Sequence, residues 1–267
     1  MMMIIDILKE ACQQVNENTK GLAGTALGSV QMGRGAGGDM SRRIDLIAEK
    51  TVIDVIRARG IEATIIGEEY GRIEGKEGYI IIDAIDGTTN AICGIPFFCC
   101  SIAYATDFYL SAVAEAAIID LPRGDLYYAS KNKGAFLNDR RIFVKREPTS
   151  DSTIGINVSG VKPALVERLA PIIAEANHIR QFGANALEMC FVARGFLDAY
   201  IDLRGKIRPT DVAAGYLIAK EAGAKIYSDD GSDLESNLDV KTRLSYAAVA
   251  NDNIREQLAT LFDKKYR

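Results

Sequence analysis

Two aspartates and a glycine come directly after an apolar run in this chain. Residues 79–90 read YIIIDAIDGTTN, so four strand-forming residues lead into Asp83, and Asp86 and Gly87 follow closely. Acids at the end of a strand suit a hydrophobic core badly, but they can hold hard metal ions with backbone N–H groups beside them. We therefore place a predicted metal and phosphate site at this stretch.

Other carboxylates also fall at the boundaries of predicted elements. Glu68 and Glu69 follow residues 63–67, which read as a short strand, and Asp211 stands at the start of a predicted helix with Thr210 as its N-cap. Such positions favour acids in any protein, so each one alone is as often structural as functional. Taken together, all-oxygen ligands select Mg²⁺, Mn²⁺ or Ca²⁺ over zinc, and a pair of such ions can clamp a phosphoryl group and activate water.

A glycine-rich segment over residues 21–38 precedes one more pair of acids. It contains GRGAGG, which matches a dinucleotide-binding pattern letter by letter, but that pattern requires a preceding strand and none is predicted. We predict a mobile loop here instead. Asp39 and Asp45 then flank the start of the next predicted helix.

The remaining inventory excludes several reaction types. His178 is the only histidine and lies between a predicted helix and a predicted strand, so a histidine base is not expected. The chain has no G-x-S-x-G and no G-x-x-x-x-G-K-[ST] motif, and none of its five cysteines has an arginine six positions later. The odd number of cysteines without a CxxC pair predicts reduced thiols in a cytoplasmic protein.

Composition limits the partners. The chain has 267 residues, of which 48% are hydrophobic and 25% charged, and its formal net charge is −4. A chain with this balance offers no general basic surface, so no nucleic-acid partner is expected. Its N-terminus reads as an amphipathic helix rather than a signal peptide. Pro96 and several glycines interrupt the longest uncharged run, so no membrane partner is expected either.

The rest of the chain must position the acids, and its pattern predicts two parts. Residues 1–140 read as an α+β part that carries the metal and phosphate motifs, and residues 141–267 as an α/β part that carries the substrate loops and Asp211. Helical and strand periodicities support this division. Helices are predicted over 4–17, 44–60, 163–177, 186–194, 210–222 and 252–262, and strands over 63–67, 79–83, 97–104, 111–119, 124–129, 134–138, 141–144, 153–158, 179–182, 196–202, 225–227 and 246–250.

Taken together, the motifs resemble the inositol monophosphatase family and in particular its archaeal branch. The segments that carry the resemblance are GEE at 67–69, DAIDGTTN at 83–90, KGAFLN at 133–138, TDVAAG at 210–215 and EAGAKI at 221–226. The resemblance spans roughly residues 39–252. It implies an αβαβα layered sandwich, commonly a homodimer, and two to three Mg²⁺ ions per subunit, with Mn²⁺ as a possible substitute.

The resemblance also implies the metal ligands. Glu68, Asp83 and the carbonyl oxygen of Ile85 match the ligands of the first metal ion. Asp83, Asp86 and Asp211 match those of the second ion. In this family the residues concerned hold the metal ions that activate a water molecule for attack on phosphorus.

Further positions match residues around those ions. Thr88 and Glu68 match the pair that orients the attacking water, and Gly87 with Thr88 matches the backbone N–H groups that hold the phosphate. Asp39 matches a position that assists a third metal ion in archaeal members, and Asp45 is its rival for that role. The positions that match substrate contacts are Gly183, Ala184, Asn185, Asp202 and Arg204.

The function implied is a Mg²⁺-dependent phosphomonoesterase that hydrolyses myo-inositol 1-phosphate and fructose 1,6-bisphosphate with metal-activated water and no covalent enzyme intermediate. The long segment DLRGKIRPTD, residues 202–211, favours the archaeal branch, which often hydrolyses both compounds. Two alternatives remain: a phosphatase for 3′-phosphoadenosine 5′-phosphate or NADP from the same superfamily, and an inactive homologue that only binds. The sequence does not rank these substrates.

Overall fold

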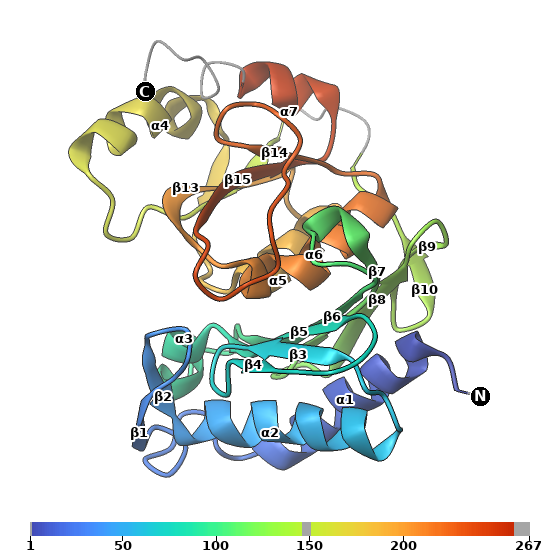
Figure 1. Cartoon of the computed structure of the whole chain (residues 1–267). Helices are drawn as coiled ribbons and strands as arrows, with labels where there is room; N and C mark the ends of the chain where they lie inside the picture. The colour runs from blue at the N-terminus through green and yellow to red at the C-terminus, as the bar shows by residue number, and fades with distance from the viewer. Residues whose placement is uncertain (1, 146–150, 259–267) are drawn as a thin grey trace.

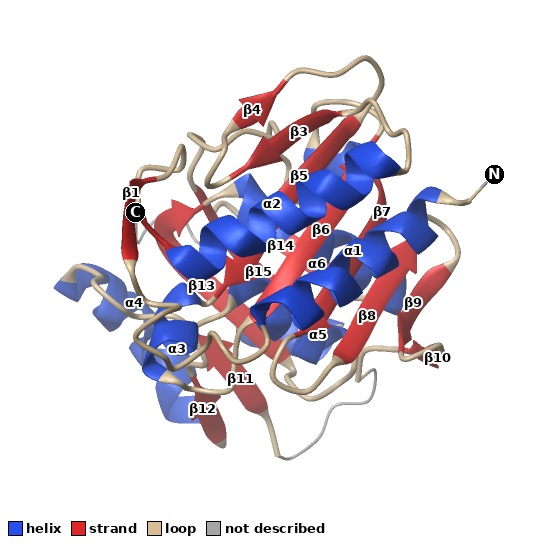
Figure 2. Cartoon of the chain, turned by 90° about the horizontal axis from the view of Figure 1, so that it is seen from below, coloured by secondary structure: helices blue, strands red, loops and turns tan. Residues whose placement is uncertain are grey.

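The computed structural model describes residues 2–145 and 151–258, and it consists of five stacked layers (Figure 1). Helices α1 (Ile4–Thr19) and α2 (Arg43–Ala58) form the first layer and lie side by side across the larger sheet (Figure 2). Helices α5 (Asn185–Ala193) and α6 (Pro209–Ala222) lie between the two sheets. The αβαβα sandwich that the sequence predicts is therefore confirmed.

The larger sheet has eight strands in the order β10-β9-β8-β7-β6-β5-β3-β4. β3 and β5 are parallel neighbours, whereas the other pairs are antiparallel. The strands are β3 (Thr64–Gly67), β4 (Arg72–Ile73), β5 (Tyr79–Asp86), β6 (Cys99–Ala105), β7 (Val113–Asp120), β8 (Asp125–Ser130), β9 (Gly134–Leu137) and β10 (Arg140–Ile142).

The smaller sheet has five strands in the order β12-β11-β13-β15-β14. Helices α4 and α7 pack on its outer face, where Leu169, Ile172 and Ile254 join its core. The elements are β11 (Thr153–Ile156), α4 (Pro163–Glu175), β12 (His178–Arg180), β13 (Ala199–Ile207), β14 (Lys225–Ser228), β15 (Leu244–Val249) and α7 (Asp252–Gln257). The predicted helix over 252–262 is confirmed as far as Gln257, and residues 259–262 lie outside the described residues.

The layered arrangement explains which residues of the helices and strands are buried. In α1 the residues Leu8, Cys12 and Val15 recur at helical spacing and are fully buried against the sheet, as expected for an amphipathic helix. In α6 every residue from Pro209 to Ala219 is buried, because sheets cover both of its sides. β5 is buried from Ile80 to Asp86 for the same reason, since helices pack on both faces of its sheet.

Two local predictions need correction. The glycine-rich segment is not only a loop, because Gln31–Arg34 (β1) and Met40–Arg42 (β2) pair as a two-stranded antiparallel ribbon. Positive φ angles at Gly33 and Gly38 allow the chain to turn there. The strand predicted to end at Asp83 continues to Asp86, since a bulge keeps it paired with β6.

The division into parts over 1–140 and 141–267 stays a prediction. β10, the last strand of the larger sheet, ends at Ile142, and α6 from the second part lies against the larger sheet.

The five cysteines are all free thiols. Among the described helices, none combines the length and the apolar character needed to cross a membrane.

Candidate active site

Three carboxylates from three separate elements meet at one end of the larger sheet. Glu68 follows β3, Asp83 lies in β5 and Asp211 lies in the first turn of α6, and each offers an oxygen within 4.8 Å of the others. β3 and β5 are parallel and Gly67 pairs with Ile82, so Glu68 and Asp83 leave the sheet at the same edge. The structure thus brings together three of the predicted metal ligands.

Asp86 reaches the same region because of the bulge in β5. Asp83 pairs with Ser101 and Asp86 with Cys99, so one extra residue is accommodated on β5. The Asp86 carboxylate accepts the backbone N–H of Ala186 at 2.6 Å in the first turn of α5, where a negative charge is favoured. The bulge therefore turns two acids of one strand toward the same site.

These acids line a cavity of about 400 Å³. Its wall contains seven acidic residues and four basic ones. The predicted site residues on the wall are Asp39, Glu68, Asp83, Ile85, Asp86, Gly87, Thr88, Gly183, Asn185, Arg204 and Asp211, and the rival Asp45 is there too. Ala184 and Asp202 do not line the cavity.

Asp211 is held by a different cap from the one predicted. Helix α6 begins at Pro209, its N-cap is Arg208, and Thr210 lies inside the first turn. Proline fixes the backbone for a first helical position, and the Asp211 carboxylate accepts the Arg208 N–H at 3.0 Å. Thr210 Oγ1 is 3.0 Å from Asp211 Oδ1. The predicted capping role of Thr210 is therefore wrong, and this threonine instead contacts the site.

Gly87 and Thr88 connect β5 to the short helix α3 (Thr88–Cys93). Gly87 has a φ of 91°, which an L side chain rarely adopts. A Cβ atom there would lie 3.1 Å from the Cβ of Ala184 and 3.2 Å from the carbonyl oxygen of Phe97. Both the turn and the packing thus require glycine, and the backbone beside the acids stays accessible from the cavity.

The hydroxyl of Thr88 faces Asp45 rather than Glu68. Its Oγ1 atom lies 3.3 Å from Asp45 Oδ1 and 3.0 Å from the carbonyl oxygen of Ile85. The other carboxylate oxygen of Asp45 accepts the N–H of Arg42 at 2.8 Å and so caps α2. Burial raises the pKa of Asp45 to about 7. The role of Thr88 and Glu68 in orienting water stays a prediction, and the contact between Thr88 and Asp45 was missed because Asp45 reads in the sequence as an ordinary helix-capping acid.

The carboxylates oppose one another electrostatically. Burial, and then the charge of Asp211, raises the pKa of Glu68. Burial, and then the charges of Glu68 and Asp86, raises the pKa of Asp83. The pKa of Asp86 is raised to about 8, mainly by burial and then by Asp211. Clustered oxygens without nitrogen or sulfur donors fit a hard divalent cation, which would relieve this repulsion.

Two supporting residues were missed by the sequence analysis. Glu49 is fully buried in α2, and its carboxylate accepts the N–H groups of Glu69 and Tyr70 at 2.9 Å each, which fixes the backbone just after Glu68. The only sequence signal for Glu49 is an acid among the apolar positions of a helix. Arg208 contacts Glu68 directly, and its signal is its place three residues before Asp211.

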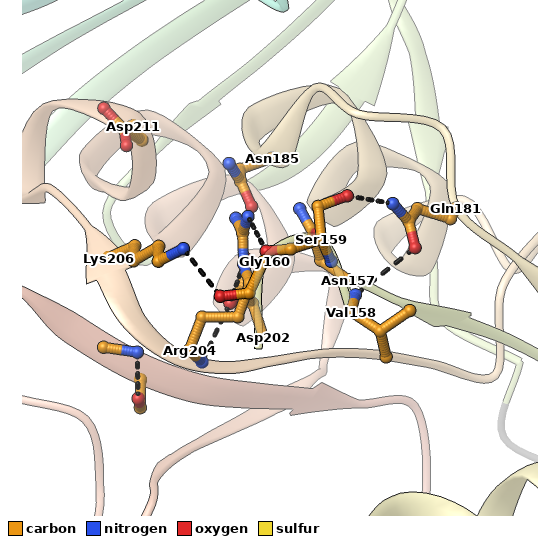
Figure 3. Close-up of polar contacts among 12 residues, drawn as sticks. Asn157, Val158, Ser159, Gly160, Gln181, Asn185, Asp202, Arg204, Lys206 and Asp211 are labelled. Atoms are coloured by element: carbon orange, nitrogen blue, oxygen red, sulfur yellow. Dashed lines mark hydrogen bonds and ion pairs between the residues drawn. The ribbon is translucent and has the colours of Figure 1, made fainter. Parts of the chain in front are cut away.

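The far wall of the cavity is basic and comes from β13 (Figure 3). Lys206 Nζ donates to the carbonyl oxygen of Gly160 at 3.0 Å, and the guanidinium of Arg204 binds the carboxylate of Asp202 at 2.6–3.0 Å. Asn185 accepts the hydroxyl proton of Tyr200 at 2.5 Å. Lys206 was not predicted, although it lies in the same segment as Arg204.

Two predicted substrate contacts are not supported by this geometry. Asp202 is fully buried, and both of its carboxylate oxygens accept hydrogen bonds from Arg204. Ala184 is fully buried and packs toward Gly87. The carboxylate of Asp202 therefore binds the guanidinium of Arg204, and of this pair Arg204 alone lines the cavity.

Comparison with known proteins gives consistent matches over almost the whole chain. Residues 3–266 match the model of the inositol monophosphatase family. A fructose-1,6-bisphosphatase/inositol-1-monophosphatase of Methanothermobacter thermautotrophicus is 35% identical over 259 residues, which are 92% of this chain and 91% of the relative. A bifunctional NADP phosphatase/NAD kinase of Methanococcus maripaludis is 30% identical over 286 residues, covering 99% of this chain but 50% of the relative. A crystal structure described as an inositol monophosphatase–fructose 1,6 bisphosphatase matches with a TM-score of 0.88 at 29% identity, and covers 97% of this chain and 100% of that one.

Proposed function

This chain belongs to the inositol monophosphatase family, and from that premise we propose that it is a Mg²⁺-dependent phosphomonoesterase acting on myo-inositol 1-phosphate and fructose 1,6-bisphosphate. The observation that carries the proposal is the meeting of Glu68, Asp83 and Asp211, whose oxygens lie within 4.8 Å of one another. The cavity beside them is lined mainly by polar and charged residues and has the size of a small phosphorylated polyol or sugar.

The residues that would hold the ions are those of the acidic cluster. Glu68, Asp83, Asp86, Asp211 and the carbonyl oxygen of Ile85 supply oxygen ligands for two ions, and Asp39 is the candidate for a third. When bound, Mg²⁺ supplies the Lewis acidity that activates water and stabilises the leaving oxygen, and Mn²⁺ has similar ligand preferences. Phosphate monoester hydrolysis without a covalent intermediate then needs no nucleophilic side chain.

The chain's own groups orient the substrate and move a proton. Thr88 is within hydrogen-bond distance of Asp45, whose pKa of about 7 suits it to accept a proton that passes through the threonine hydroxyl. Glu68 lines the same cavity and would orient the water with Thr88. The backbone at Gly87 and Thr88 would hold the phosphate oxygens.

Substrate selection would come from the opposite wall. Gly183 and Asn185 face the polyol space, and Arg204 and Lys206 add positive charge about the same cavity. Two cations on the wall of the same cavity as the acidic cluster favour a substrate with a second phosphate. Fructose 1,6-bisphosphate carries such a second phosphate, whereas inositol 1-phosphate does not, so both compounds are proposed as substrates. A nucleotide substrate such as NADP or 3′-phosphoadenosine 5′-phosphate is the second candidate, because one relative is named an NADP phosphatase.

A phosphate-release panel tests the proposal. The compounds are inositol 1-phosphate, fructose 1,6-bisphosphate, 2′-AMP, NADP and 3′-phosphoadenosine 5′-phosphate, each assayed with Mg²⁺ and with EDTA. We expect release from the first two that EDTA abolishes and Mg²⁺ restores. Preference for NADP or the phosphoadenosine would favour the second candidate, and no release from any compound would favour an inactive binding homologue. A homodimer and a cytoplasmic location are also parts of this proposal.

A further inference from the structure

We propose that Arg208 is an internal counter-cation of the acidic cluster, which a divalent ion must displace from Glu68 and Asp39, so that this one side chain sets the metal affinity. The inference rests on the metal site of the proposed function. It goes further in assigning to a residue outside the ligand set the control of how tightly the ions bind.

The first observation is the position of the guanidinium group. Arg208 NH1 donates to Glu68 Oε1 at 2.8 Å, while NH2 contacts the carboxylate of Asp39 and donates to the carbonyl oxygen of Gly37 at 3.1 Å. The side chain is 11% exposed, whereas that of Asp39 is 80% exposed. One arginine therefore joins the end of β3 to the glycine-rich segment, and it does so from inside the cavity.

The second observation is that the other cations on the wall are engaged elsewhere. Arg42 donates to the carbonyl oxygen of Ser29, Arg204 binds Asp202, and Lys206 donates to the carbonyl oxygen of Gly160. In the part of the chain that the structure describes, the ion pairs of the cavity's acids are those to Arg208. It is thus the charge that directly offsets the cluster.

The third observation is that the guanidinium is incompletely satisfied. Its Nε atom is buried and has no hydrogen-bond partner among the described residues. An arginine that served only as a structural clamp would be expected to use its donors fully. A guanidinium that leaves one buried donor unused is more easily replaced by a different cation.

The physical consequence is a competition between like charges. The guanidinium and a divalent cation both require the carboxylates of Glu68 and Asp39, and two cations held by one carboxylate repel each other in a partly buried site. The glycine-rich segment would stay attached to the end of β3 when the guanidinium moves away, because two backbone hydrogen bonds also hold it there. Gly37 N–H donates to the carbonyl oxygen of Glu68 at 2.8 Å, and Ala36 N–H donates to that of Glu69 at 3.2 Å. The exchange thus needs a side-chain movement but no unfolding of the ribbon.

Two opposite roles of Arg208 predict opposite changes in metal affinity. If Arg208 oriented Glu68 for the ion, then removing the guanidinium would weaken metal binding. If Arg208 competes with the ion, then removing it strengthens metal binding. We therefore measure the Kd of Mg²⁺ and of Mn²⁺ by isothermal titration calorimetry on protein stripped with EDTA, without substrate.

Arg208→Gln is the test variant and Arg59→Gln is its matched control. Arg59 forms a bidentate pair with Glu10 away from the cavity, so each change removes one positive charge and two hydrogen bonds to carboxylates. We expect Arg208→Gln to bind Mg²⁺ about tenfold more tightly than the wild type, and Arg59→Gln to stay within about twofold. An unchanged or weaker affinity in Arg208→Gln overturns the inference.

Two further variants separate charge from packing and from folding. Arg208→Lys keeps the positive charge, and we expect its Kd to stay within about threefold of the wild type. Arg208→Met removes the charge but keeps an apolar stem, so it replaces Arg208→Gln if that variant is unfolded without metal, with the same expected result. A wild type that binds no Mg²⁺ would overturn the proposed function and this inference together. A wild type that binds Mg²⁺ while the folded neutral variant, Arg208→Gln or its replacement Arg208→Met, does not bind it more tightly overturns this inference alone.

Discussion

The carboxylate of Asp86 accepts the backbone N–H of Ala186 at 2.6 Å, which ties β5 of the larger sheet to a helix one hundred residues later. Asn90 reinforces this junction by donating to the carbonyl oxygens of Phe97 and Phe182 at 2.7 Å. Gly183 and Asn185, which line the cavity, lie directly beside this junction. A single buried carboxylate can therefore belong to the acidic cluster and also fix a loop in the cavity wall.

Asp83→Asn should lower the kcat of phosphate release by at least ~10²–10³, the scale of losing one preorganised stabilising group. Asp83 is central because its neighbours Glu68, Asp86 and Asp211 all interact with its charge. Phosphate release at saturating Mg²⁺ measures the effect, and circular dichroism verifies that the variant is folded. Near-normal turnover in a folded variant would remove Asp83 from the proposed ligand set.

Thr88→Ala should lower kcat by about 10²-fold or more, because it removes the cavity-lining hydroxyl that lies within hydrogen-bond distance of Asp45. Thr88→Ser keeps the hydroxyl and serves as the matched control, with an expected loss of less than about tenfold. KM for the phosphate ester should change little in either variant. If the alanine and serine variants were equally active, the threonine would have only a packing role in α3.

Lys206→Ala should raise KM for fructose 1,6-bisphosphate by about tenfold and KM for inositol 1-phosphate by less than about threefold, since only the former carries a second phosphate. Lys225→Ala is the control, because Lys225 pairs with Asp252 and lies away from this cavity. Steady-state kinetics on both substrates give the comparison. An equal rise for both substrates would place Lys206 near the common phosphate instead.

Glu188→Gln should change the pH dependence of stability. Glu188 is buried in α5 below the loop at Gly183, it accepts the N–H of Phe182 at 3.2 Å, and burial raises its pKa to about 7 from an ordinary 4.5. A raised acid pKa means that the folded state binds the proton more tightly. The stability that protonation contributes is then complete below about pH 4.5 and is lost as the pH rises through about 7.

The variant lacks this loss, so its free energy of unfolding minus that of the wild type should increase by about 2 kcal/mol between about pH 5 and about pH 8. Urea unfolding of both proteins in EDTA measures the difference, and the other acids cancel in the comparison. A difference that stays constant with pH would show that Glu188 is ionised in the folded protein throughout this range.

Local pattern in the sequence determined the helices, most strands and the positions of the acids. The apolar spacing of α1 and α2 and the β-branched run before Asp83 are visible in windows of a few residues, because amphipathic burial imposes its own period. The glycine at position 87 and the acids around it could be recognised for the same reason, since a motif is a local property. The ribbon β1–β2 was missed because its four and three residues are short and poor in β-branched side chains.

Tertiary structure alone decided which of those residues face one another. Thr88 meets Asp45 across 43 positions of sequence, and Arg208 meets Asp39 across 169, so no local window contains either pair. Asp202 is buried against the guanidinium of Arg204, and of this pair Arg204 alone lines the cavity. The sequence thus named the acids of the cluster, whereas the packing of two sheets around α5 and α6 decided their partners, among them the guanidinium of Arg208.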